Sequence, residues 1–453
     1  MRLEQLHIQN YRCFGNLTIE LHPELTVLIA PNGAGKTTIL DAARVALWPF
    51  VKGFDLGSQT GKAANIHPLD VRLSKQSDGN MEAQVPCKIT AKGYWGDTAA
   101  SDFWAQKREQ IKGGNTLTDA RTKKLTAHAK QLQQQVRAGQ LPVTLPLISY
   151  LGTSRLWFEG RFTSIAANTT LDKNEFSRTS GYLNCLAYSS SFKAFTAWYG
   201  WIYRSYRESQ INALEKNSEL DDVGLRFGQT VEVIKTAVDA LVQKATGWHS
   251  LEYSQRHNQQ LVMYHEQHGV MPVDMLSDGL RNAIAMVADL AFRAYKLNPH
   301  LGPKAALETP GVALIDEVDM FLHPSWQQTI LQSLRTAFPK VQFIVSTHSP
   351  QVLSTVRREN IRVLEGDTAE PPLAMTYGEP SSDVMHSVMS VDPLPPVKEK
   401  KLLDRLTELV DTGHYESARA QKLFCLLNAR LGSSHPQLTI LLRNIRRMEA
   451  LRK

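Results

Sequence analysis

The fold of this chain is most directly predicted from the stretch Leu25-Thr26-Val27-Leu28-Ile29-Ala30-Pro31-Asn32-Gly33-Ala34-Gly35-Lys36-Thr37-Thr38. It begins as a short apolar run of the kind that forms a buried strand. Gly33 and Gly35 let the next segment curl so that successive backbone N–H groups face one anion, and the start of a helix adds a partial positive charge. A strand, a glycine-rich loop and a helix in this order predict a phosphate-binding loop in an α/β protein.

The residues of this loop have expected roles toward a bound nucleotide. Lys36 suits the β- and γ-phosphates, and Thr37 offers its hydroxyl to Mg²⁺. The other candidate nucleotide-binding residues of the loop are Asn32, Gly33, Ala34, Gly35 and Thr38. Ala30 replaces the usual first glycine, and a glycine-rich turn without a ligand is the alternative. After Lys36 apolar residues recur on one helical face, and Pro49 is expected to end that helix.

A second apolar run, residues 311–315, ends in two carboxylates. Asp316 suits the binding of Mg²⁺, and Glu317 suits the general base that polarises an attacking water. The alternative is a strand that happens to end in acids. Asp319, two residues past Glu317, supports the first interpretation.

Two further segments point to the same chemistry. A strand expected at 341–345 is followed by His348, and a histidine placed one strand beyond an Asp-Glu pair is expected to sense a γ-phosphate. An amphipathic helix opens within Leu276-Ser277-Asp278-Gly279-Leu280-Arg281, where Ser277 has the position of an N-cap. Gly279 is unfavourable in a helix unless some group approaches its backbone closely, and a phosphate from another subunit is such a group.

Together these segments resemble the ABC-type ATPases, and among them the group of the RecF and SMC kind. Five motifs stand in that family's order: Walker A at 30–37, signature at 276–281, Walker B at 312–317, D-loop at 318–319 and switch histidine at 348. The opening stretch 6–14 resembles the first strand of that group and adds Arg12 to the nucleotide-binding candidates. Two positions depart from the pattern of the signature, Asp278 and Leu280, and the Q-loop glutamine has only candidate places, Gln59 or the stretch 66–72.

The resemblance implies a Mg²⁺-dependent ATPase in which ATP lies between two subunits. One subunit would contribute Lys36, Thr37, Asp316, Glu317 and His348. The other would contribute Ser277 and Gly279, with Asp319 lining the seam between them.

A closer resemblance concerns the stretches 146–157, 180–186 and 406–451. They are similar to stretches of stand-alone bacterial defence ATPases, the ATPase subunits of Septu systems and of their retron-linked relatives. This implies an anti-phage complex in which the ATPase controls a separately encoded HNH nuclease, forms ATP-dependent head-to-head dimers and a higher oligomer, and has DNA as a candidate partner. Two alternatives stay open: a nucleotide-sensing scaffold with little turnover, and a DNA repair or recombination ATPase of the RecF/SMC kind.

The expected architecture is α/β, an ABC-type P-loop ATPase head with a mixed sheet and flanking helices. The expected parts are an N-terminal lobe with Walker A (1–95), a mostly helical insertion (96–260), a C-terminal lobe with the signature, Walker B, D-loop and switch histidine (261–390) and a basic helical tail (391–453).

Composition narrows the class of protein. The 453 residues are 42% hydrophobic and 21% charged, which excludes a disordered chain, a collagen and an uninterrupted coiled coil. No apolar run approaches the roughly 18 residues that span a bilayer, and the polar N-terminus does not fit a signal peptide, so we expect a cytoplasmic protein without a membrane partner. The four cysteines stand alone and are expected to be reduced thiols.

Other enzyme and transport classes fit less well. Residues 363–367 resemble the first acidic motif of a TOPRIM nuclease, but no Asp-x-Asp follows, so no intrinsic nuclease site is expected. The large insertion argues against a transporter subunit, and Pro142 and Pro146 argue against a long SMC arm.

The net charge of +7 is unevenly distributed, because two segments are strongly basic and the rest of the chain is slightly acidic. Residues 101–140 hold eight basic against three acidic residues, and residues 397–453 hold twelve against six. Apolar residues recur at helical spacing in the second segment, which we expect to serve assembly, with four arginines available to an acidic partner or a DNA backbone: Arg443, Arg446, Arg447 and Arg452. The alternative is a helical pair that folds onto its own subunit.

Overall fold

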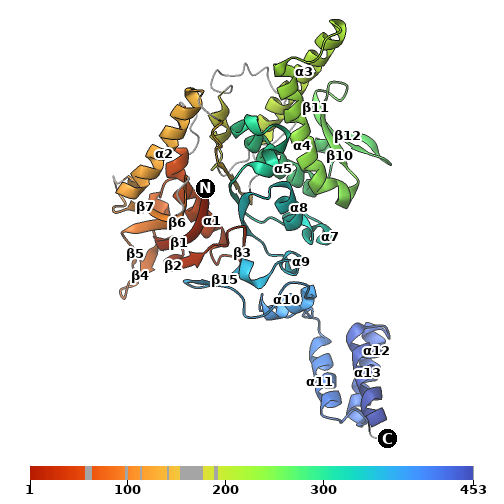
Figure 1. The fold of residues 1–453 in the computed structure, drawn as a ribbon. Helices are drawn as coiled ribbons and strands as arrows, with labels where there is room; N and C mark the ends of the chain where they lie inside the picture. Colours follow the sequence, from red (N-terminus) through yellow and green to blue (C-terminus); the bar gives the residue numbers. More distant parts are fainter. Residues whose placement is uncertain are drawn as a thin grey trace. The chain divides into compact units, whose positions relative to one another are not determined.

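The computed structural model describes residues 1–56, 64–96, 100–112, 115–139, 142–153, 177–187 and 192–451 (Figure 1). It divides into two compact units, Met1–Val384 and Met385–Lys453, which we call the large unit and the tail unit. Gln59, Arg452 and the end of the stretch 146–157, residues 154–157, were named in the sequence analysis and lie outside the described residues. Among the helices described, none is long and apolar enough to cross a membrane.

The large unit is built on two sheets. The first is antiparallel in the order β2-β1-β6-β7-β8 and consists of β1 (Arg2–Tyr11), β2 (Phe14–Glu20), β6 (Cys87–Tyr94), β7 (Asp102–Arg108) and β8 (Leu117–Thr118). The second has the order β16-β15-β3-β14-β13-β9 and consists of β3 (Leu25–Ile29), β9 (Leu147–Leu151), β13 (Gly311–Ile315), β14 (Val341–Ser346), β15 (Ile361–Glu365) and β16 (Thr368–Glu370). Its strands are parallel except for β16. The α/β fold class predicted from the sequence is confirmed.

Helix α1 (Lys36–Val51) lies between the two sheets. It packs on β1, β6 and β7 of the first sheet and on β13 and β14 of the second, and its residues from Ile39 onward are buried on every side. The apolar face predicted from the sequence is therefore only part of the buried surface of this helix.

The expectation that Pro49 ends this helix is also wrong, because α1 continues to Val51. A proline inside a helix leaves the carbonyl four residues earlier without its usual N–H partner. Here that carbonyl belongs to Val45, and the side chain of Gln106 on β7 donates to it. Trp104 Nε1 on the same strand donates to the next carbonyl, that of Ala46, at 2.7 Å. Two side chains of β7 thus donate hydrogen bonds to the helix carbonyls one turn before the proline.

The middle of the chain is more interleaved with the two lobes than the sequence predicted. Its helices are α2 (Ala120–Arg137), which packs on α1 and β7, and the mutually packed pair α3 (Phe192–Glu215) and α4 (Asp222–Thr246). However, β7 and β8 extend the first sheet, and β9 forms an edge of the second. A three-stranded sheet of β10 (His249–Ser254), β11 (Gln260–His265) and β12 (Gly269–Pro272) leads to α5 (Asp278–Leu297).

Short elements complete the large unit: β4 (Leu73–Lys75), β5 (Met81–Ala83), α6 (Ala305–Glu308), α7 (Pro324–Gln327), α8 (Ile330–Ala337) and α9 (Pro350–Leu353). Helix α10 (Ser381–Ser387) spans the division between the units.

The tail unit has a core of its own. Its helices α11 (Lys400–Asp411), α12 (Ala418–Leu431) and α13 (Pro436–Leu451) pack together, with α11 in contact with both others (Figure 1). The apolar residues that recur at helical spacing meet in this core, which includes Leu403, Leu406, Val410, Leu427, Leu438 and Leu441. These apolar residues are therefore buried within the tail unit itself and do not need a surface outside it.

Candidate nucleotide-binding site

The parallel strands of the second sheet bring the predicted motifs to one edge. Strand β14 lies between β3 and β13, so the residues that follow these three strands are neighbours. They are the glycine-rich loop after β3, the acidic turn after β13 and the segment Thr347–Ser349 after β14. The carboxyl end of a parallel sheet is the usual place for a ligand in α/β proteins.

The loop has the backbone geometry that its glycines predict. Gly33 and Gly35 have φ values of 81° and 102°, in the left-handed region that glycine adopts without strain. A Cβ on Gly35 would also collide with the ring of Phe14 and with Cys13 Sγ, so this position has no room for another residue. Gly35 is the N-cap of α1, no side chain caps this helix start, and its first turn holds no acid. The N-terminus of α1 is thus available to an anion.

Lys36 lies against the loop that precedes it. Its side chain is buried, and Nζ donates to the carbonyls of Ala30 at 2.9 Å and Pro31 at 3.3 Å. Burial lowers the pKa of Lys36, while the nearby carboxylates of Asp316, Glu317 and Asp319 act in the opposite direction. The ammonium group is thus placed between the loop and the acidic turn.

The other loop residues lie in different environments. Asn32 and Thr37 are exposed, and Ala34 is half-buried, with its backbone N–H donating to the carbonyl of Pro31 at 3.3 Å. Thr38 is buried, and its hydroxyl lies 3.9 Å from Cys13 Sγ.

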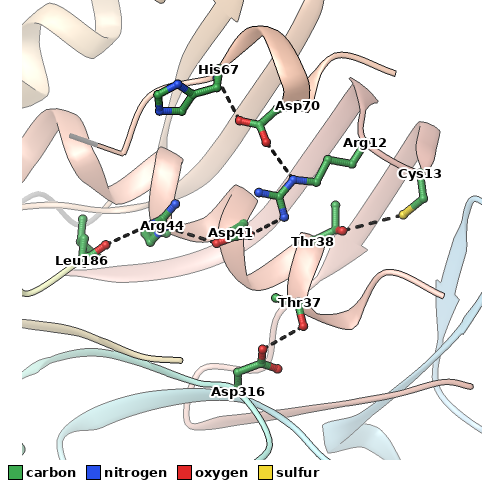
Figure 2. Close-up of polar contacts among 10 residues, drawn as sticks. All are labelled: Arg12, Cys13, Thr37, Thr38, Asp41, Arg44, His67, Asp70, Leu186 and Asp316. Atoms are coloured by element: carbon green, nitrogen blue, oxygen red, sulfur yellow. Dashed lines mark hydrogen bonds and ion pairs between the residues drawn. The ribbon is translucent and has the colours of Figure 1, made fainter. Parts of the chain in front are cut away.

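Thr37, in the first turn of α1, and Asp316, directly after β13, contact each other, as Figure 2 shows. The Thr37 hydroxyl donates to Asp316 Oδ2 at 2.8 Å, which leaves the lone pairs of the hydroxyl oxygen available to a cation. A hydroxyl and a carboxylate are hard oxygen ligands, the kind that Mg²⁺ prefers. No group of three or more His, Cys, Asp or Glu side chains is arranged to hold a metal among the described residues. This donor set fits Mg²⁺, which usually takes one or two carboxylates and completes its shell with water and substrate phosphate.

Glu317 follows Asp316 in a left-handed backbone conformation, with φ of 48°. A non-glycine residue with this φ is uncommon and is often found at functional sites. Its half-buried side chain and that of Asp319 lie within electrostatic reach of Lys36 and His348. Burial, followed by the positive charge of Lys36, lowers the pKa of His348, so the neutral ring is favoured at neutral pH. The structure thus brings Lys36, Thr37, Asp316, Glu317, Asp319 and His348 together.

Ser277 and Gly279 have contacts of a different kind. Ser277 is the N-cap of α5, and its hydroxyl accepts the backbone N–H of Leu280 at 3.5 Å. A Cβ on Gly279 would collide with the carbonyl oxygen of Phe321, and Asn282 on the same helix donates to the carbonyl of Met320 at 2.9 Å. The close approach that requires glycine is therefore made by the chain's own segment 320–321.

Arg12, predicted as a nucleotide contact, is engaged in a different interaction (Figure 2). Its guanidinium group donates to Asp41 on α1 and, at 2.9 Å, to Asp70 Oδ1. Burial disfavours the charge, but Tyr11, Asp41 and Asp70 together outweigh it and raise the pKa of Arg12. Arg44 Nε lies 3.3 Å from the other oxygen of Asp41. The sequence reasoning missed this network, although Asp41 and Arg44, two charged residues within the otherwise apolar stretch 39–51, were a signal for it.

The acidic stretch that resembles a nuclease motif has structural contacts. Glu365 ends β15 within the second sheet. The Asp367 carboxylate accepts the backbone N–H groups of Gly15 at 2.9 Å and Asn16 at 3.3 Å. These contacts connect the β15–β16 turn to the start of β2.

Two family models match the chain. A model described as an AAA domain matches residues 5–244, more than half of the chain, and a second model of an AAA domain matches residues 148–354. Together the two matches include the loop and both acids of the site.

Individual relatives agree with these models. The chain is 27% identical to the Retron Ec83 probable ATPase of Escherichia coli over 95% of its own length and 84% of that protein's. It is 25% identical to the Retron Vc95 probable ATPase of Vibrio cholerae over 93% of its length and 86% of that protein's. The OLD nuclease of Thermus scotoductus is 25% identical over 81% of this chain and 62% of that protein.

Two further similarities are more limited. The Septu protein PtuA of Bacillus mycoides is 36% identical over 20% of this chain and 12% of that protein. Among solved structures, an SMC head bound to the C-terminal winged-helix domain of ScpA aligns with a TM-score of 0.47 at 13% identity, over 82% of this chain and 97% of that one. From the extent of the first family match, the chain belongs to the AAA-domain family of ATPases.

Proposed function

We propose that this protein is the ATP-binding and ATP-hydrolysing subunit of a bacterial anti-phage defence complex, and that it controls a separately encoded, HNH-type nuclease. The observation that carries the ATPase proposal is the meeting of the loop and the acidic turn, where Thr37 donates to Asp316 next to the buried Lys36. The defence role is supported by the similarity to two retron ATPases over nearly the whole chain and to a Septu protein over a short stretch.

In this proposal the side chains of the large unit divide the work of hydrolysis. Lys36 and the open N-terminus of α1 hold the phosphates, and Thr37 and Asp316 hold Mg²⁺, which when bound neutralises charge on the transferred phosphoryl group. Glu317 orients the attacking water and accepts its proton. The neutral ring of His348 can donate a hydrogen bond to the γ-phosphate without adding a charge beside Lys36.

The second half of each ATP site is proposed to come from another copy of the chain. Within one copy, the contacts of Ser277 and Gly279 run to α5 itself and to Phe321, whereas those of Thr37 run to Asp316. An ATP-dependent head-to-head dimer would place the signature residues on the partner's phosphates, with Asp319 at the seam. Higher oligomers and contact with DNA are part of the same proposal.

The nuclease is proposed to be a partner protein because Asp367, in the stretch that resembles a nuclease motif, is bound to the backbone of residues 15–16. The basic helices of the tail unit, with Arg443, Arg446 and Arg447 exposed on α13, are the proposed surface for assembly.

The Glu317→Gln variant tests the ATPase proposal. We expect it to bind ATP as wild type does. Its rate of phosphate release should fall about 100-fold or more, because the base is absent while the phosphate-binding groups remain. ATP should therefore trap it as a nucleotide-bound dimer, which size-exclusion chromatography with light scattering would detect. Glu308→Gln, a change in the short helix α6 before β13, is the matched control and should leave turnover unchanged.

The same experiment separates the proposal from its main alternative. If wild-type protein releases no phosphate with Mg²⁺, DNA or any nucleotide stimulus but still binds ATP, a nucleotide-sensing scaffold is favoured. If the protein does not bind ATP, the proposed function fails altogether.

A further inference from the structure

Ser346, the last residue of β14, makes three contacts with the acidic turn. Its hydroxyl donates to Asp316 Oδ1 and accepts the backbone N–H of Glu317 at 2.8 Å. Its carbonyl accepts the backbone N–H of Val318 at 3.0 Å. Ser346 is fully buried, so water cannot replace the hydroxyl in either contact.

These contacts fix the orientation of the Asp316 carboxylate. One oxygen accepts from Ser346 and the other from Thr37, so the carboxylate is held between the end of β14 and the start of α1. A rotation of this carboxylate would break at least one of the two hydrogen bonds. The side chain is therefore preoriented before any cation arrives.

The contact with Glu317 acts on the backbone. Glu317 has a left-handed φ of 48°, a conformation that costs energy for a residue with a side chain. The hydrogen bond from its N–H to Ser346 Oγ, together with that from Val318 N–H, holds the turn in this conformation. The direction in which the Glu317 side chain leaves the backbone therefore depends on Ser346.

Thr347 repeats the arrangement one residue later. Its hydroxyl donates to Asp319 Oδ1 and accepts the backbone N–H of Ser349 at 3.0 Å. Its own backbone N–H donates to the carbonyl of Leu28 at the end of β3. The end of β14 thus positions a carboxylate with each of two consecutive hydroxyls.

We propose that Ser346 is a positioning residue that sets the Asp316 carboxylate for Mg²⁺ and holds the Glu317 turn in its active conformation. This inference rests on the proposed function, because it assigns Mg²⁺ to Asp316. In this role Ser346 acts through its hydrogen bonds to Asp316 and to the backbone of Glu317.

The test is the Mg²⁺ dependence of nucleotide binding in Ser346→Ala. The probe is a fluorescent ATP analogue, titrated in EDTA and at increasing Mg²⁺. We expect similar affinity in EDTA and a Mg²⁺ concentration for half-maximal enhancement that is raised about tenfold, as expected for the loss of a hydrogen bond to a charged group. Turnover should fall by a similar factor or more. Ser346→Thr keeps the hydroxyl and should restore both values.

Ser149→Ala is the matched control. Ser149 is a buried serine on β9 of the same sheet, and its hydroxyl donates to a carboxylate outside the site, Asp289 Oδ2, at 3.2 Å. It should leave the Mg²⁺ dependence unchanged. Thermal unfolding reports whether Ser346→Ala is folded, and Ser346→Cys, which conserves size, replaces it if it is not.

The inference is overturned if folded Ser346→Ala, or Ser346→Cys in its place, has the wild-type Mg²⁺ dependence, or if Ser346→Thr is as impaired as the alanine variant. A wild-type protein that binds MgATP without hydrolysing it would contradict the proposed ATPase activity, but the Mg²⁺ titration would still decide the role of Ser346. Binding that is independent of Mg²⁺ in the wild type would overturn the assignment of Asp316 and this inference with it.

Discussion

The starts of helices α1 and α5, which supply the two halves of the proposed ATP site, differ in how their first backbone N–H groups are satisfied. Helix α1 has Gly35 as its N-cap residue, without a side-chain cap and without an acid in its first turn. Helix α5 is capped by Ser277, and Asp278 in its first turn compensates the partial positive charge. One helix start is open to an anion, and the other is already occupied by its own residues.

This difference indicates which half of the site is preformed. At the start of α1 there is no side-chain cap that an anion would have to displace. At the start of α5 the backbone N–H of Leu280 already donates to the Ser277 hydroxyl, at 3.5 Å, so only the O–H of Ser277 remains to donate to a phosphate. We therefore expect nucleotide to bind to the α1 half first and the α5 half to join only when two copies close.

The largest expected effect comes from removing the charge at the preformed half. Lys36→Ala should weaken ATP binding about 100-fold, because the phosphates lose a charged hydrogen-bond donor, and turnover should be lost with it. Isothermal titration calorimetry with ATP measures this. Lys52→Ala, at the other end of α1, is the control and should bind normally. Unchanged affinity for ATP in Lys36→Ala would contradict the assignment of this loop as the phosphate-binding loop.

A smaller effect on binding is expected at the other half. Ser277→Arg should leave the affinity of a single copy for ATP within about twofold of wild type, yet reduce ATP-driven dimerisation at least tenfold, because the added bulk enters the partner's phosphate site. Ser277→Gly removes the cap at a cost of a few tenths of a kcal/mol without adding bulk, and should dimerise better than the arginine variant. Normal dimerisation of Ser277→Arg with ATP would contradict a site shared between subunits.

The smallest effect on either half is expected from removing most of the tail unit. Since the tail builds its own core, a chain that stops after Pro396 should remain soluble and bind ATP within about twofold of wild type. It should no longer form the native oligomer or retain its nuclease partner, which co-purification measures. An insoluble product, or a fully assembled and active one, would contradict an assembly role.

The sequence was informative where chemistry and backbone geometry depend on neighbouring residues. The loop at 30–38 and the acids at 316–317 were predicted because a strand end, two glycines and a pair of carboxylates are local features. Their placement at one edge followed from the parallel sheet. The assigned roles remain predictions.

Other features could not be predicted because they depend on contacts between distant segments. Pro49 lies inside α1, and the Gln106 side chain donates to the Val45 carbonyl in place of the N–H that proline lacks. No local sequence pattern links these residues. Arg12 is paired with Asp41 and Asp70, which only the folded chain brings together. Ser346 looked like any serine after a strand until its bonds to the acidic turn were visible.

The central claim, that each ATP site is built from two copies, is tested most directly by mixing two inactive variants. Lys36→Ala lacks the first half of the site, and Ser277→Arg lacks the second. A mixed dimer contains one intact site, so mixing should restore turnover clearly above that of either variant alone. Random pairing with independent sites sets an upper bound of roughly a quarter of the wild-type value, and the arginine at the second site of the mixed dimer is expected to keep turnover below that bound. Turnover of the mixture no greater than that of the separate variants would contradict the shared site.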